Sequence, residues 1–183
     1  MQPEDLGSVN SQQADIVHSH TDLAEHNNAL GVLDLLWPQA GLELIIDLSR
    51  QPDGLALITG PDSGDVIEQF AELLGSEILH VGRELTRSMS RPTAGDVQSL
   101  LTGHHCLTGL EILFDPVLGL RPVAVLRDLA RRQSHLFAVW PAAAPDPRNL
   151  PHMDRQHLAG SVLLVSRRTV FADDPLFTVE RFN

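Results

Sequence analysis

Short apolar runs alternate with amphipathic stretches along the chain after residue 54. The apolar runs predict five strands, at Leu55–Thr59, Glu77–Val81, His105–Thr108, His135–Trp140 and Ser161–Val165. Helical spacing between them predicts helices at about Gly64–Leu74, Thr93–Leu101 and Pro122–Arg132. Strands that alternate with helices favour a parallel sheet, because parallel neighbours need crossover connections. We therefore expect an α/β fold with a mostly parallel sheet of about five strands and helices on both faces.

Two segments fall outside this alternation. From Leu30 to Gln51 the apolar residues recur at helical spacing, and Pro38 divides them into a short first piece and a helix over about Leu42–Arg50. Residues 142–160 are rich in proline, which predicts a long loop that crosses over or beside the sheet.

Residues 1–30 are polar and contain too few large apolar residues to build a core. We expect this segment to be a flexible acidic tail, followed by a single α/β domain over residues 31–183. Its histidines, His18, His20 and His26, are of a type that binds divalent metals. Their spacing matches no ordered ligand set, so we expect a solvated tail and no metal site.

Charge and composition narrow the function. The chain of 183 residues is 43% hydrophobic and 20% charged, which suits one soluble domain with a sizeable core. Its formal net charge is -11, and an acidic chain repels a phosphate backbone, so we do not expect direct DNA binding. All 13 cationic residues are arginine, which excludes any mechanism that needs a lysine ammonium from the same chain.

Cysteine content and hydropathy indicate the compartment. Cys106 is the single cysteine, so no intramolecular disulfide and no cysteine zinc site within one chain is expected. No segment approaches the roughly 18 apolar residues of a membrane span, and the first residues carry acids where a signal peptide is basic. We expect a cytoplasmic protein that does not associate with a membrane.

The stretch LALITGPDSGDVIEQF, residues 55–70, has the outline of a phosphate-binding loop. In the pattern GxxxxGK[ST], the glycines let backbone amides close around phosphates, the lysine neutralises their charge and the hydroxyl ligates magnesium. Here Gly60 and Gly64 enclose three residues where the pattern has four. Asp65 occupies the position of the lysine, and Val66 occupies that of the serine or threonine. These differences predict a vestigial loop, which comprises Gly60, Pro61, Asp62, Ser63, Gly64 and Asp65.

The acids of this loop disfavour a nucleotide. Asp62 and Asp65 would face the negative charges of a triphosphate, and like charges a few ångströms apart repel. In the structural interpretation, which we favour, Asp62 or Ser63 caps the following helix and Asp65 adds a favourable charge near its N-terminus. We expect no cofactor, and ATP with magnesium only if the altered loop binds nucleotide in an unusual way.

The second part of an ATPase signature is an apolar strand that ends in Asp, often followed by Glu, to hold magnesium and activate water. The best candidate is HHCLTGLEILFDP, residues 104–116, whose predicted strand ends at Thr108. A threonine hydroxyl ligates an ion only as a neutral group, and Glu111 follows three residues later. We regard Thr108 and Glu111 as a vestigial metal-binding position and expect no catalytic residue.

Three arginines recur every four residues in RELTRSMSR: Arg83, Arg87 and Arg91. On one helix they would form a basic stripe near the carboxyl end of the second predicted strand, the edge where open parallel sheets bind ligands. The stripe could contact an acidic partner or a phosphate. Alternatively it is a solvated helix face that Glu84 partly neutralises.

Four stretches between Leu55 and Pro141 carry a resemblance to a known family. They read LITGPDSGDV, LHVGRELTRSM, LEILFDPVLGLRPVAVLRDLARR and FAVWPAA. Together they resemble the small P-loop-containing (BrxF-type) protein of type 3 BREX, or bacteriophage exclusion, systems. Ordinary members carry an intact GxxxxGK[ST] loop and an acidic strand end. Gly60, Pro61 and Gly64 match that loop, whereas Asp65 and the residues at positions 66 and 108 depart from it.

The resemblance implies a P-loop NTPase-like fold and a role in bacterial anti-phage defence. The partners that it implies are a large ATPase, a methyltransferase and a phosphatase-like protein. With the degenerate motifs, this predicts a non-catalytic subunit that acts through protein contacts. Two alternatives remain open: a nucleotide-binding switch or weak ATPase with an atypical loop, and an accessory module that contacts DNA phosphates through arginines. A homo-oligomer is also compatible with the sequence.

Overall fold

The computed structural model describes residues 33–36, 45–47, 54–88, 91–133, 135–158, 162–171 and 174–181. All of them belong to one unit, Val32–Asn183. The expected acidic tail and its three histidines lie outside the described residues.

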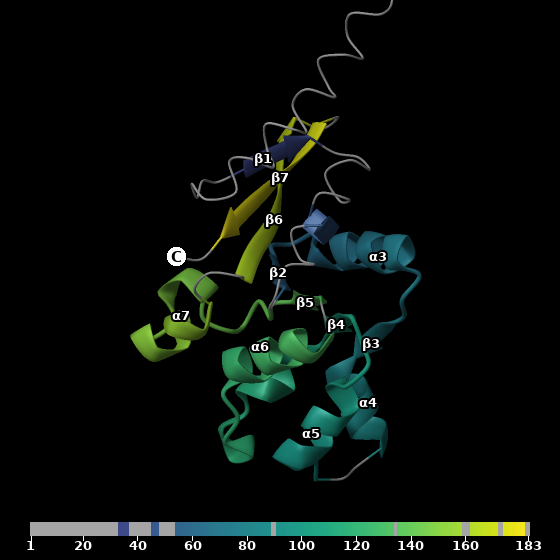
Figure 1. The fold of residues 1–183 in the computed structure, drawn as a ribbon, viewed down its shortest axis with the longest axis vertical. Helices are drawn as coiled ribbons and strands as arrows, with labels where there is room; N and C mark the ends of the chain where they lie inside the picture. The colour runs from purple at the N-terminus through teal and green to yellow at the C-terminus, as the bar shows by residue number, and fades with distance from the viewer. Residues whose placement is uncertain are drawn as a thin grey trace, which may run out of the picture. The chain divides into compact units, whose positions relative to one another are not determined.

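The described strands form a single seven-stranded sheet (Figure 1). They are β1 (Leu33–Leu36), β2 (Leu55–Thr59), β3 (Ile78–His80), β4 (Cys106–Thr108), β5 (Leu136–Val139), β6 (Val162–Phe171) and β7 (Asp174–Arg181). Their order across the sheet is β1-β7-β6-β2-β5-β4-β3. The strands from β6 to β3 pair in parallel, whereas β7 is antiparallel to both β6 and β1. The predicted α/β class with a mostly parallel sheet is confirmed, whereas the predicted number of about five strands is too low, because β1 and β7 extend the sheet.

Helices and helical turns connect the parallel strands. The α-helices are α3 (Ser63–Leu74), α4 (Val81–Ser88), α5 (Ala94–Leu101), α6 (Pro122–Gln133) and α7 (His152–Leu158). The short 3-10 helices are η1 (Leu110–Phe114), η2 (Pro116–Leu118) and η3 (Pro147–Asn149). The three helices predicted from periodicity correspond to α3, α5 and α6, and each begins or ends within one residue of its predicted bounds.

Strand β2 lies in the interior of the sheet, between β5 and β6. Its first four residues, Leu55–Ile58, are all buried, because helices cover both of its faces. Leu55 and Leu57 pack in one cluster with side chains of α4, α5, η1 and α6. Ala56 and Ile58 pack in a second cluster with α3 and with Ile45 and Ile46. The predicted arrangement of helices on both faces is therefore confirmed.

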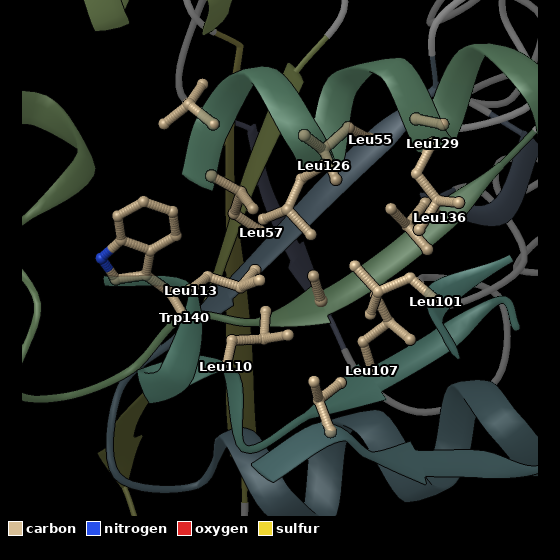
Figure 2. Close-up of a cluster of buried hydrophobic side chains, with 14 of the residues drawn as sticks. Leu55, Leu57, Leu101, Leu107, Leu110, Leu113, Leu126, Leu129, Leu136 and Trp140 are labelled. Carbon is tan, nitrogen blue, oxygen red and sulfur yellow. The ribbon is translucent and has the colours of Figure 1, made fainter. Parts of the chain in front are cut away.

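The larger of these two clusters is made chiefly of leucines. Figure 2 shows Leu55, Leu57 and Leu136 from the sheet facing Leu126 and Leu129 of α6. On the other face, Phe70 of α3 stacks on Phe137 of β5, with ring centroids 4.5 Å apart. These two layers fix the sheet, so that the loops after β2, β4 and β5 start from rigid strand ends.

Three sequence predictions are corrected. Residues 33–36 are strand β1, paired with β7, and not the first piece of a helix. Four residues carry too little periodicity to specify a helix, and pairing with β7 decides their conformation. The predicted loop over residues 142–160 contains η3 and α7. Strand β6 continues to Phe171, beyond its predicted end, because β7, which the sequence did not reveal, pairs along it. Residues 45–47 are helical, as predicted.

Candidate functional site

A cleft of about 590 Å³ lies at the carboxyl ends of β2, β4 and β5. Its lining comes from the loops that follow these strands: Gly60, Pro61 and Ser63 after β2, Gly109 and Glu111 after β4, and residues 139–142 around the end of β5. The volume falls within the range of small-molecule sites, about 300–1,000 Å³. The cleft thus brings part of the vestigial loop and Glu111 together at the edge where open parallel sheets bind ligands.

The turn after β2 has the backbone of a tight glycine turn. Gly60 adopts φ of 102°, a conformation that residues with a Cβ atom rarely adopt. The amide of Ser63 donates a hydrogen bond to the Gly60 carbonyl at 3.3 Å, and α3 begins at Ser63. The chain therefore turns directly from the buried strand into the helix, and Gly64 already lies inside the first helical turn.

The capping role expected of Asp62 is corrected in part. Asp62 occupies the N-cap position of α3, but its side chain forms no capping hydrogen bond. The Asp62 carbonyl instead accepts the first helical hydrogen bond, from the amide of Val66 at 3.1 Å. Asp65 lies exposed in the first turn, where a negative charge interacts favourably with the helix dipole. Ser63 is the first helical residue and not the cap.

The lining of the cleft carries one negative charge and no positive one among the described residues. Glu111 contributes the carboxylate, from the exposed first turn of η1. The other lining residues are glycine, proline, serine, alanine, valine and tryptophan. A ligand that enters the cleft therefore meets a carboxylate and neutral groups, and no side chain among the described lining residues offers a phosphate a positive charge.

Thr108, at the vestigial metal-binding position, is engaged with a neighbouring side chain. Its hydroxyl lies 2.6 Å from Nδ1 of His80, which ends the adjacent strand β3 at the same register. Which of the two atoms donates depends on the imidazole tautomer. Thr108 is not among the residues that line the cleft, whereas Glu111 is. His80 was not a sequence candidate, since its position beside Thr108 follows from strand order.

Two glycines let the ends of β3 and β4 approach closely. The Gly82 amide donates a hydrogen bond to the Gly109 carbonyl at 3.0 Å. A Cβ atom on Gly82 would lie 3.3 Å from that same carbonyl oxygen, and Gly109 adopts φ of 65°. This contact fixes the backbone that leads from β4 into η1, and thereby the position of Glu111.

Trp140 forms a wall of the cleft and is itself almost buried. Its side chain is 6% exposed, and its indole Nε1 donates a hydrogen bond to the Pro145 carbonyl at 2.9 Å. The ring meets Phe114 edge to face, with centroids 5.1 Å apart. Its backbone amide donates to the Ile58 carbonyl at 2.8 Å, which ties the end of β5 to β2. These contacts make Trp140 a structural residue at the edge of the core.

The arginine stripe is only partly formed. Arg83 and Arg87 lie on α4 with side chains 63% and 71% exposed, and each is within 3.7 Å of the Glu84 carboxylate. Helix α4 ends at Ser88, so Arg91 lies beyond it, in a bend. The expectation of three arginines on one helix face is therefore wrong. The pairing with Glu84 fits the interpretation of a partly neutralised, solvated face.

Cys106 behaves as a buried apolar residue. It is fully buried in β4, and burial raises the pKa of its thiol to about 11 despite a hydrogen bond with the Ser76 side chain. Within the described part of the chain, no group of three or more histidine, cysteine, aspartate or glutamate side chains is arranged to hold a metal ion. No helix among the described residues has the length and apolar character to cross a membrane.

No protein-family model, curated protein or solved structure matches the chain. Inferences about its function therefore depend on its own sequence and geometry.

Proposed function

We propose that the protein is a non-catalytic α/β module of the P-loop type, which acts through protein contacts as a subunit of an anti-phage (BREX-like) defence complex. The P-loop assignment is supported by the turn that follows β2. A glycine turn that joins an interior parallel strand to the N-terminus of a helix is the arrangement of phosphate loops. Here Gly60 makes that turn and α3 follows it directly.

The charge of the cleft carries the proposal that no nucleotide acts there. Glu111 lines the cleft, Asp62 is the N-cap residue of α3, and Asp65 lies in its first turn. Two like unit charges about 5 Å apart repel by about 0.8 kcal/mol in water, and a triphosphate carries several such charges. The chain has no lysine to offset this repulsion. The fold would then serve as a rigid scaffold for contacts with other proteins.

The defence context rests on the sequence resemblance and is tested in cells. In a host that carries this gene within a phage-defence cluster, deletion of the gene should raise the plating efficiency of a sensitive phage. A tagged copy should restore protection and recover other products of the cluster on affinity capture. Full protection without the gene would contradict the proposal.

The non-catalytic part is tested on the purified protein with an ATP hydrolysis assay. We expect phosphate release equal to that of buffer, and no change in Glu111→Gln. If the wild-type protein releases phosphate faster than buffer and Glu111→Gln does not, the result would instead support the alternative function of a weak ATPase.

A further inference from the structure

The carboxylate of Glu111 is the one charged group in the lining of the cleft among the described residues. Among the described residues it has no partner for a hydrogen bond or an ion pair. The other described residues that line the cleft are neutral. Elsewhere on the surface, acids near arginines are paired. Glu84 lies 3.4 Å from Arg87, and Glu180 lies 2.9 Å from Arg148.

The walls around Glu111 are suited to an aliphatic stem. Pro61, Val139, Pro141 and Ala142 present carbon atoms or backbone. The one side-chain donor of Trp140 is already used by the Pro145 carbonyl. The cleft therefore offers an apolar wall with a single strong acceptor, which matches a long side chain that ends in a cation.

We propose that the cleft binds a basic side chain, preferably an arginine, presented by a different protein. This inference rests on the proposed function, because it names the chemistry of the contact that such a module would make. A guanidinium can donate two parallel hydrogen bonds to the Glu111 carboxylate, while its methylene groups cover the apolar wall. The formal charge of -11 would also draw a basic partner toward this chain.

A different protein fits better than a second copy of this chain. A second copy carries the same formal charge of -11, so the two copies would repel each other. A basic segment of a partner is instead attracted to this chain, and its contact with Glu111 would add an ion pair.

The test uses two labelled peptides of twelve glycine and serine residues, one with three arginines and one with three citrullines at the same positions. Citrulline keeps the shape of arginine and lacks the charge. Binding is measured by fluorescence polarisation to the full chain, to Glu111→Gln and to Glu72→Gln. The last variant removes the same charge from the exposed face of α3, at a residue that does not line the cleft.

We expect saturable binding of the arginine peptide, at least about fivefold weaker in Glu111→Gln and within about twofold of wild type in Glu72→Gln. The citrulline peptide should not bind. Equal weakening in both variants would show general attraction to an acidic chain and would overturn the inference, as would the absence of saturable binding. A dimer in sedimentation that Glu111→Gln dissociates would overturn it in favour of a second copy.

Circular dichroism of both variants establishes that the fold is intact. ATP hydrolysis by the wild-type protein would overturn the proposed function, whatever the peptides do. Failure of the peptide-binding inference and failure of the proposed function therefore give different results.

Discussion

Replacement of Trp140 by phenylalanine tests how the wall of the cleft is held. The indole is 6% exposed, donates to the Pro145 carbonyl at 2.9 Å and meets the edge of Phe114 at 5.1 Å. Phenylalanine keeps one aromatic ring in this position but loses the donor and the volume of the second ring. The variant therefore removes a hydrogen bond and leaves a small void beside the leucine-rich cluster.

The magnitude follows from these two losses. A neutral hydrogen bond contributes about 1 kcal/mol net, and Pro145 is exposed, so water can solvate the carbonyl that is left. The lost ring volume costs roughly 1–2 kcal/mol, by analogy with other large-to-small core replacements. We expect the free energy of unfolding to fall by about 2–3 kcal/mol. With a urea m-value of about 2 kcal/mol/M, the unfolding midpoint falls by roughly 1 M.

The assay is urea unfolding followed by far-ultraviolet circular dichroism, because the replacement removes a fluorescent reporter. Phe114→Leu is the matched control, since it loses the edge-to-face contact and keeps the indole hydrogen bond. It should cost about 1 kcal/mol. A midpoint for Trp140→Phe that equals that of wild type would refute the reasoning that the indole anchors the loop after β5.

Three further perturbations act away from the cleft. Cys106, fully buried with a pKa raised to about 11, should not react with a thiol reagent in the native protein, and should react once urea unfolds it. Thr93→Ala removes the side-chain hydrogen bonds of the capping box of α5 and should lower the free energy of unfolding by about 1 kcal/mol at pH 7. Hydrogen bonds from Thr93 lower the pKa of Asp96 below its ordinary value of 3.8. These hydrogen bonds therefore stabilise the folded protein fully above pH 3.8. This stabilisation is lost as the pH falls through the lower pKa that Asp96 has in the folded state. Urea midpoints of wild type and Thr93→Ala should accordingly lie closer together at pH 2 than at pH 7. Arg148→Ala breaks the half-exposed contacts with Glu180 and Asp146 and should cost less than about 1 kcal/mol by urea unfolding, with the difference shrinking in 1 M salt.

The parts of the fold that the sequence predicted are those with a strong local signal. Strand β2 has its predicted bounds, since an unbroken apolar run bounded by a glycine turn is typical of an interior parallel strand. Helix α7 has seven residues, HMDRQHL, with too few apolar positions to show a period. Strand β7 depends on its antiparallel pairing with β6, which is not a local property.

The candidate site likewise combines residues that a local sequence pattern identifies with contacts that depend on the fold. The spacing of Gly60 and Gly64 and the position of Glu111 made these residues candidates from the sequence. The meeting of Gly60 and Glu111 in one cleft depends on the strand order, which places β2 and β4 on either side of β5. For the same reason the sequence could not reveal the hydrogen bond between His80 and Thr108, residues 28 positions apart.

The central claim is that the loop after β2 no longer binds nucleotide, and calorimetric titration of the purified chain with ATP and magnesium tests it most directly. We predict no saturable heat up to millimolar ATP, because the cleft offers the Glu111 carboxylate and, among its described lining residues, no cation. A saturable isotherm with a micromolar Kd would contradict the account.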